Sequence, residues 1–196
     1  MLPVTNTMLR RETALRPTFE QSLRHGRIAE GKIAEYLRRR GFSVIPAYEK
    51  EIGEGKGPQV FTPVDELVAP DLFVVRNGVC RWVEAKCKTV FTWHRKSRRW
   101  VTGIDLRHYN EYQKVGRHFG WEVYLLFLHT CPRPDPRDVE GGCPAVCPTG
   151  LFEGRLSWLT EHENHRHDNW GRSGMVYWAH ERLRPVAPVG STGEIQ

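Results

Sequence analysis

Two carboxylates and a lysine attract attention because a predicted turn would bring them together. The segment "DLFVVRNGVCRWVEAK" holds Asn77 and Gly78 between two apolar runs, and Asn-Gly in this setting is a strong signal for a two-residue hairpin turn. With that turn, Asp71 lies directly opposite Glu84, and strand alternation puts Lys86 on the same face. Like charges directly opposite each other destabilise a sheet, so this arrangement needs a physical reason.

A divalent cation between the carboxylates is one reason. Mg²⁺ prefers oxygen ligands and usually takes one or two carboxylates together with water and substrate phosphates. A nearby ammonium would orient an attacking water and favour an anionic transition state. The alternative is a salt-bridged surface, in which Lys86 neutralises Glu84 and Asp71 only starts a strand after Pro70. The Pro-Asp pair, the turn and the matching Glu-Ala-Lys favour the cation.

The elements that must position these residues alternate between helix and strand. Apolar residues recur at helical spacing over residues 17–40, Gly41 ends the run, and Gly26 leaves open a division into two helices. We further expect a strand at 42–48, a polar loop at 49–70, the hairpin at 71–87 continued by 88–93 into a basic hairpin with its tip near 94–97, a helix at 105–119 capped by Asp105 and stopped by Gly120, a central strand at 121–129, a short helix at 156–162 and a late edge strand at 174–183.

This order predicts a mixed α/β domain with helices packed on a central sheet. The expected domain spans residues 17–185 and contains a Cys-bearing insertion at 129–150. A flexible arm at 1–16 would precede it, and a tail at 186–196 would follow it.

The composition is that of a soluble globular protein. Of the 196 residues, 39% are hydrophobic and 27% are charged, and this length suits one ordinary domain. The longest apolar run, "VYLLFL", is far shorter than the roughly 18–20 residues of a membrane span. Because the N-terminal segment also lacks the apolar region of a secretory signal, we expect a cytoplasmic protein with reduced thiols and no membrane partner.

Basic residues are concentrated in the segment "KCKTVFTWHRKSRRW", within a chain whose formal charge is +6. Cations neutralise phosphates, and aromatic faces stack on bases. The candidate nucleic-acid-binding residues of this segment are Lys88, Trp93, Arg95, Lys96, Arg98, Arg99 and Trp100. The alternative is a solvated hairpin tip whose tryptophans pack beneath a loop.

The pattern "PD" at 70–71 followed by "EAK" at 84–86 resembles the signature of the PD-(D/E)xK nuclease superfamily. The resemblance covers about residues 26–128 and implies a restriction-endonuclease-like core, a mixed sheet flanked by helices. Many members carry an acidic residue on the preceding helix, and Glu30 in "GRIAEGKIAEYLRRRGF" supplies one. Such arrangements are common among resolvase-like, repair and phage-encoded nucleases.

The resemblance also implies roles for individual residues. Asp71, Glu84, Glu30 and the carbonyl of Ala85 would hold metal, Lys86 would position the attacking water, and Gln113 and Tyr112 would line the cleft from the next helix. The alternative for Glu30 is a plain surface position, and for Gln113 and Tyr112 it is helix surface or core.

The insertion at 129–150 offers a second set of metal ligands. Zinc prefers four His or Cys ligands, and His129, Cys131, Cys143 and Cys147 would complete such a set. The spacing is not one of the compact C-x₂-C knuckles, which favours a polar loop with incidental cysteines over a structural Zn²⁺. The histidine-rich segment "HENHRHD" at 162–168 is expected to be an exposed loop.

Together these patterns predict a Mg²⁺- or Mn²⁺-dependent nuclease that cuts DNA by in-line attack of water. The alternatives are an RNA- or structure-specific nuclease using the same site, or a nucleic-acid-binding protein that keeps the fold without activity. The intact set of Asp71, Glu84 and Lys86 argues against an inactive descendant. Many nucleases of this fold work as homodimers, and the sequence leaves the oligomeric state open.

Overall fold

A six-stranded mixed sheet forms the centre of the protein. The computed structural model describes residues 19–47, 58–171, 173–190 and 192–196, so the predicted arm at 1–16 lies outside the described residues. The sheet has the order β1-β4-β5-β8-β9-β12, with β1 at Ser43–Pro46, β4 at Leu72–Arg76, β5 at Val79–Lys88, β8 at Val123–His129, β9 at Gly150–Arg155 and β12 at Arg184–Ala187.

The two central strands, β5 and β8, run parallel, whereas every other neighbouring pair in this sheet is antiparallel. A parallel pair needs a long crossover connection. Here the crossover contains α2, which spans Leu106–Phe119. The predicted fold class, a mixed central sheet flanked by helices, is therefore confirmed.

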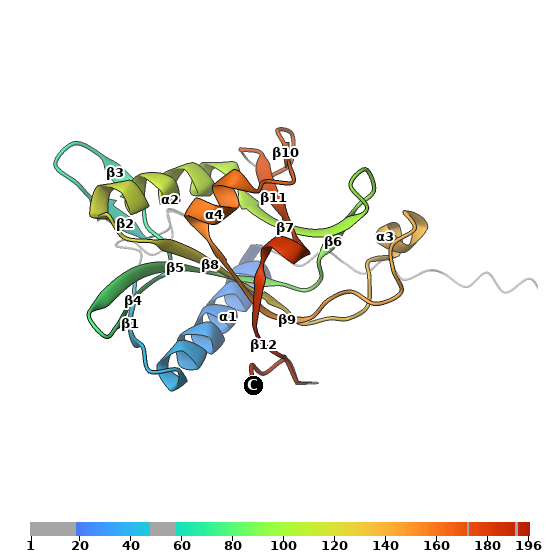
Figure 1. The fold of residues 1–196 in the computed structure, drawn as a ribbon, viewed down its shortest axis with the longest axis horizontal. Coiled ribbons are helices and arrows are strands. Elements are labelled where there is room, and N and C mark those ends of the chain that lie inside the picture. The colour runs from blue at the N-terminus through green and yellow to red at the C-terminus, as the bar shows by residue number, and fades with distance from the viewer. Residues whose placement is uncertain (1–18, 48–57, 172, 191) are drawn as a thin grey trace, which may run out of the picture.

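Helices cover both faces of this sheet (Figure 1). The long helix α1, Phe19–Arg39, lies on one face, and α2 with the short helix α4, Leu156–Glu161, lies on the other. Within the part of the chain that the structure describes, none of the helices is long and apolar enough to span a membrane.

The α1 face has its own apolar core. Ala29, Ile33, Tyr36 and Leu37 are buried and belong to one cluster with buried side chains of the sheet, including Val83. Their spacing is that of one helix face, and α1 continues through Gly26 without a break.

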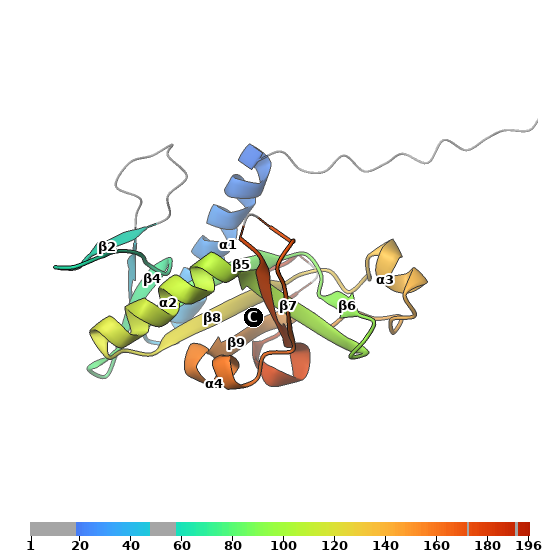
Figure 2. The same cartoon turned by 90° about the horizontal axis from the view of Figure 1, so that it is seen from above.

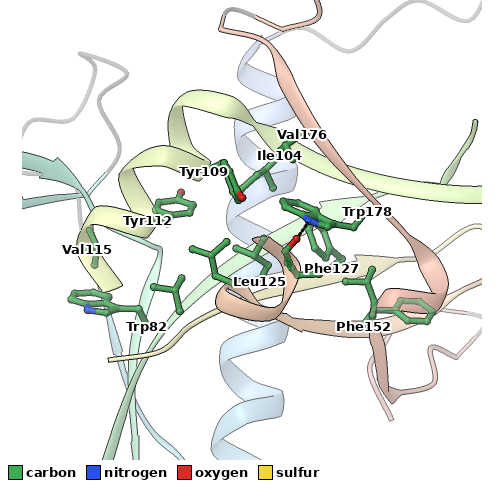
Figure 3. Close-up of a cluster of buried hydrophobic side chains, with 14 of the residues drawn as sticks. Trp82, Ile104, Tyr109, Tyr112, Val115, Leu125, Phe127, Phe152, Val176 and Trp178 are labelled. Atoms are coloured by element: carbon green, nitrogen blue, oxygen red, sulfur yellow. Dashed lines mark hydrogen bonds between the residues drawn. The ribbon is translucent and has the colours of Figure 1, made fainter. Parts of the chain in front are cut away.

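A larger cluster fills the α2 face (Figure 3). Helix α2 begins where the Asp105 carboxylate accepts a hydrogen bond from the Arg107 N–H, and it ends at Gly120, whose φ of 64° is left-handed. Both predicted end points are thus confirmed. The helix buries Tyr109 and Tyr112 against the sheet.

A second, four-stranded antiparallel sheet has the order β10-β11-β7-β6. Its strands are β6 at Thr92–His94, β7 at Arg99–Asp105, β10 at His165–His167 and β11 at Met175–Ala179. The predicted basic hairpin is confirmed as β6 and β7, but β5 does not continue into it, because β5 ends at Lys88 and β6 pairs in this other sheet. The predicted late edge strand is also wrong in its place, since β11 lies between β10 and β7.

The remaining elements are short. They are β2 at Gln59–Phe61, β3 at Glu66–Val68, α3 at Pro136–Glu140 and the 3₁₀ turn η1 at His180–Arg182. Figures 1 and 2 both place α3 beside the β6–β7 hairpin.

The C-terminal residues lie against α1. The Lys32 ammonium donates to the Gly193 carbonyl at 2.9 Å, and the Arg39 guanidinium donates to the Ile195 carbonyl at 2.8 Å. Ile195 is buried in the α1 core. The described residues of the predicted tail, at 186–190 and 192–196, therefore pack on this face of the fold.

Candidate active site

The β4–β5 hairpin has the predicted register. Asn77 and Gly78 have φ values of 51° and 76°, and positive φ at both central residues is what a type I′ turn requires. Leu72 pairs with Val83, so Asp71 precedes β4 directly opposite Glu84.

Two hydrogen bonds hold the Asp71 and Glu84 carboxylates next to each other. One oxygen of Asp71 accepts from the Ala85 N–H at 2.9 Å, and the Asp71 N–H donates to Glu84 Oε2 at 3.3 Å. The Glu84 side chain has no exposed surface. Each carboxylate is thus fixed by the backbone of the opposite strand, and the two converge beside each other.

The convergence destabilises the ionised form of Asp71. Burial is the first cause that raises the pKa of Asp71 well above its usual value, and the charges of Glu84 and Glu30 raise it further. The Lys86 cation and the hydrogen bond from Ala85 only partly offset these effects. Positive charge at this position would relieve the repulsion.

Lys86 supplies one such charge. Its ammonium forms an ion pair with Glu84 Oε1 and keeps 31% of its side-chain surface exposed. Burial lowers the pKa of Lys86, but the carboxylates of Glu84, Asp71 and Glu30 outweigh burial, so that the pKa lies above its ordinary value. The carboxylates therefore favour the protonated form of Lys86, which is a hydrogen-bond donor beside them.

Glu30 approaches the same site from α1. Its side chain is half-buried, and its charge acts on both Asp71 and Lys86. The structure therefore brings together the three acidic residues and the lysine that the resemblance implied. Whether they hold a metal stays a prediction, since no group of three His, Cys, Asp or Glu side chains among the described residues is arranged as a metal site.

Helix α2 contributes Tyr112 to this site, and it does not contribute Gln113. Tyr112 is buried, and its pKa is raised well above the usual value by burial, by the charges of Glu84 and Asp71, and by a hydrogen bond with Glu84. The Gln113 amide instead donates to the Thr160 hydroxyl of α4 at 3.2 Å. The prediction that Gln113 lines the site is therefore corrected, because its position on the helix turns it toward α4.

Sequence reasoning missed His108, which the structure places beside the site. Its ring lies parallel to that of Tyr112, with centroids 5.8 Å apart. Burial and the Lys86 cation lower the pKa of His108, while the Glu84 carboxylate acts in the opposite direction. The available signal was the spacing to Tyr112, because residues i and i+4 share one helix face.

The two tryptophans of the basic hairpin differ in burial. Trp100 is only 7% exposed, and Trp93 packs against the same core with its ring centroid 5.2 Å from that of Trp100. The prediction that Trp100 stacks on bases is therefore wrong, since a base has no access to a buried ring. For Trp100 the structure shows the alternative, a tryptophan packed in the core, whereas the half-buried Trp93 stays a candidate for binding nucleic acid.

The cations of the hairpin divide into two groups. The Arg95 guanidinium donates to the Arg137 carbonyl at 3.0 Å, and Arg99 lies 3.4 Å from a Glu181 carboxylate oxygen. Lys96 and Arg98 are exposed, and neither has a side-chain partner within the described ranges. These two are the hairpin cations most available to a ligand.

Lys88 lies between the hairpin and the carboxylates, at the end of β5. Its side chain is half-buried. Burial and the neighbouring Lys86 cation both lower its pKa. Lys88 therefore stays a candidate nucleic-acid-binding residue.

The four predicted zinc ligands occupy different environments. The ring of His129 is fully buried and stacks on Phe91 with centroids 3.6 Å apart, and burial lowers its pKa to about 3. The buried Cys147 thiol accepts a hydrogen bond from the Phe91 N–H at 3.3 Å. Burial first, then the charge of Asp138 and to a lesser extent Cys131 and Cys143, raise the pKa of Cys147 to about 11. Among the described residues, no three His, Cys, Asp or Glu side chains are arranged to hold a metal, so the structure does not bring these four together as a zinc site.

The segment at 162–168 is not the exposed loop that the sequence predicted. His165 lies in β10, and its ring stacks between His94 and Tyr177 at centroid distances of 3.8 and 4.6 Å. Burial and the charges of His94 and His167 lower the pKa of His165 to about 4. Polar residues form this strand because their rings find partners in the second sheet.

The chain was compared with known proteins. No family model matches it, and no curated protein matches its sequence. Among solved structures, it is similar to Hjc, a Holliday junction resolvase from the archaeal hyperthermophile Archaeoglobus fulgidus. The sequences are 10% identical, the TM-score is 0.46, and the similarity covers 82% of this chain and 95% of the resolvase chain.

Proposed function

We propose that this protein is a divalent-metal-dependent nuclease that hydrolyses phosphodiester bonds in DNA at the site of Asp71, Glu84 and Lys86. One observation carries the proposal. Two converging carboxylates are fixed by the backbone of opposite strands, with a permanent cation paired to one of them. Such a set is costly to fold without a ligand, and it matches the needs of phosphoryl transfer.

The donor set suits a hard divalent cation. Asp71 and Glu84 present carboxylate oxygens, and Mg²⁺ and Mn²⁺ prefer oxygen ligands. The raised pKa of Asp71 fits this assignment, because bound positive charge would offset both the burial of the carboxylate and the repulsion by Glu84 that raise it. Asp71, Glu84 and the carbonyl of Ala85 would hold the ion, with Glu30 close enough to act on the ion or its water. When bound, it would stabilise negative charge on the phosphate and lower the pKa of a water.

The protein's own groups would orient and stabilise the reacting atoms. Lys86 keeps its proton, so it would donate hydrogen bonds to the attacking water or to a phosphate oxygen. Tyr112, whose hydroxyl also stays protonated, would hold the Glu84 carboxylate in place. The exposed Lys96 and Arg98 would contact the DNA backbone outside the site.

The experiment that tests this proposal is a cleavage assay on labelled DNA and RNA of several structures, with Mg²⁺, Mn²⁺ or EDTA. We expect cleavage of DNA with either metal and none with EDTA. Glu84→Gln should remove the activity, whereas Glu140→Gln, an exposed carboxylate of α3, should not. Cleavage of RNA alone would identify the ribonuclease alternative, and DNA binding without metal-dependent cleavage would identify a silent binding protein.

A further inference from the structure

We propose that an arginine-lined groove on the α1 face of the central sheet is a second nucleic-acid site, which binds the phosphate backbone of a single strand extending from the cut site. The groove has a volume of about 440 Å³. The residues that carry the argument are Arg40, Phe42, Arg76, Arg81, Tyr124 and Arg184. This inference rests on the proposed function, because the strand in the groove would be part of the DNA that is bound at the cut site.

The groove lies on the opposite face of β5 from the carboxylates. Arg81 lies two residues before Val83 and so shares its face, on which Val83 packs in the α1 core, whereas Glu84 points to the opposite face. Phe42 follows the end of α1 and forms part of the same lining. The groove is therefore separate from the candidate active site, although both use the same strand.

Positive charges converge in this groove. The Arg76 and Arg81 guanidinium groups lie 5.3 and 5.8 Å from the centroid of the same ring, that of Phe42. Val74 pairs with Arg81, so that Arg76 is the diagonal neighbour of Arg81. Diagonal neighbours on one sheet face are about 7–8 Å apart, and two cations at that spacing repel each other.

Acidic residues do not neutralise this convergence. Glu153 is the one carboxylate that lines the groove among the described residues, and its Oε1 accepts hydrogen bonds from Arg184 at 2.6 and 3.1 Å. The side chains of Arg40, Arg76 and Arg81 have no acidic partner in the part of the chain that the structure describes. A bound anion would supply the missing charge.

The chemistry of the lining favours a nucleic-acid strand. A guanidinium group stacked on a ring keeps its N–H edge free, and that edge binds phosphate through two parallel hydrogen bonds. Arg81 also lies over Tyr124, at 5.1 Å from the ring centroid. Arginines combined with aromatic rings in a groove are the features that bind single strands without reading their sequence.

The distance between the candidate active site and the groove determines how long the single-stranded part of the substrate must be. From Arg81 to Lys86 the strand β5 advances five residues, or about 17 Å at the usual rise of a strand. At the stacked rise of about 3.4 Å per nucleotide, roughly five nucleotides would cover this distance, and a tail that must also pass to the other face needs more. A duplex with a long single-stranded tail would fill both sites.

The test compares tail lengths at one constant duplex. A duplex with a tail of 3 or 20 nucleotides, of either polarity, is bound to the Glu84→Gln protein, and affinity is measured by fluorescence anisotropy. The long tail should bind at least about tenfold more tightly. Adding Arg76→Gln and Arg81→Gln should remove that gain and reduce the salt slope by roughly 1.4 for two lost contacts to a single strand. Adding Lys96→Gln and Arg98→Gln to the Glu84→Gln protein instead removes the same amount of charge, and it should lower the affinity for the short-tail and the long-tail duplex by the same factor.

The proposal would be overturned if the long tail raised the affinity equally in the protein with Arg76→Gln and Arg81→Gln and in the protein with Lys96→Gln and Arg98→Gln. It would also be overturned by a groove that binds inorganic phosphate or poly-glutamate through Arg76 and Arg81 while tail length has no effect, because the ligand would then be a free anion or an acidic peptide. Thermal melting of each variant, together with the same assay on the metal-free parent protein, controls for damage to the fold. Metal-dependent cleavage of the short-tail duplex tests the proposed function separately.

Discussion

The two faces of the β4–β5 hairpin each carry a pair of like charges, and the two pairs are stabilised in different ways. On the α2 face, Asp71 and Glu84 converge as two carboxylates, and on the α1 face, Arg76 and Arg81 converge as two guanidinium groups. The carboxylates are held by backbone N–H groups, and Glu84 is fully buried. The arginines lie on aromatic rings, and Arg76 is exposed.

The difference shows that burial, more than charge type, determines what a like-charge pair costs. Water screens the arginines, so their repulsion is small. Glu84 is removed from water, and burial first and the charge of Glu84 second raise the pKa of Asp71, so ionising both groups destabilises the unliganded protein. A buried pair is therefore expected to bind its counterion tightly at one point, and an exposed pair to bind a long polyanion loosely.

The largest expected effect separates chemistry from affinity. Lys86→Ala should lower the rate of DNA cleavage by roughly a thousandfold, because the protein loses a cation at the reacting phosphate, while the affinity for DNA should change little. Neutralising Arg95, Lys96, Arg98 and Arg99 together should have the reverse effect, with a loss of affinity and of salt slope of roughly 0.9 per phosphate contact on duplex DNA. If Lys86→Ala cleaves as fast as the parent protein, the reaction takes place elsewhere.

A second prediction asks whether burial alone destabilises a single titratable group. His129 has a folded pKa of about 3, below its unfolded value, so its contribution to stability is complete above about pH 6.5 and is lost as the pH falls toward 3. Relative to the parent protein, His129→Phe should gain on the order of 2 kcal/mol between pH 7 and pH 4.5. Urea unfolding of both proteins at the two pH values measures this difference, and parallel pH profiles would contradict it.

A third prediction concerns the buried carboxylates directly. Because the folded pKa of Asp71 is raised, its ionised form destabilises the metal-free protein, and this loss grows as the pH rises through the folded pKa. Asp71→Asn should therefore raise the thermal midpoint at pH 7 by roughly 2–4 °C, or about 1 kcal/mol, and the gain should fade toward pH 4.

Metal provides the control for Asp71→Asn. Mg²⁺ should stabilise the parent protein, since a ligand that binds only the folded state raises its stability, and it should not stabilise the variant. A variant that melts below the parent protein at pH 7 without metal would show that Asp71 is stabilising, and the comparison of the two faces would fail.

The smallest effect is expected on the other face. Arg81→Gln should change the free energy of unfolding by no more than about 0.5 kcal/mol, because the repulsion that it relieves is screened. Chemical denaturation in low and high salt is a suitable measurement. A large stabilisation by Arg81→Gln that disappears in high salt would mean that repulsion between the arginines destabilises the protein as much as repulsion between the carboxylates does.

The candidate active site was largely predictable from sequence because it is local. Asn77 and Gly78 fix the hairpin register, and the register alone places Asp71 opposite Glu84. The ends of α2 were predictable for the same reason, since Asp105 and Gly120 act within one turn of the helix.

The parts that escaped prediction depend on distant partners. Trp100 is buried by a sheet whose neighbouring strand β11 begins at Met175, and nothing near Trp100 in the sequence indicates this. The arginine groove combines Phe42, Arg81 and Arg184, which come from three separated segments. Hydrophobic periodicity shows that a helix or strand is amphipathic, but only the tertiary arrangement determines which side chains come into contact.

The parallel pairing of β5 with β8 has a consequence for the order of folding. The hairpin that joins β4 to β5 closes a short loop, whereas β5 meets β8 only after the whole segment between Lys88 and Val123 has been placed. Short-range contacts generally form faster, so we expect Asp71 and Glu84 to meet in a hairpin that is still hydrated. Docking of β8 and α2 then removes Glu84 from water. That late step should be the one slowed by the unneutralised carboxylates and accelerated when a cation is already bound.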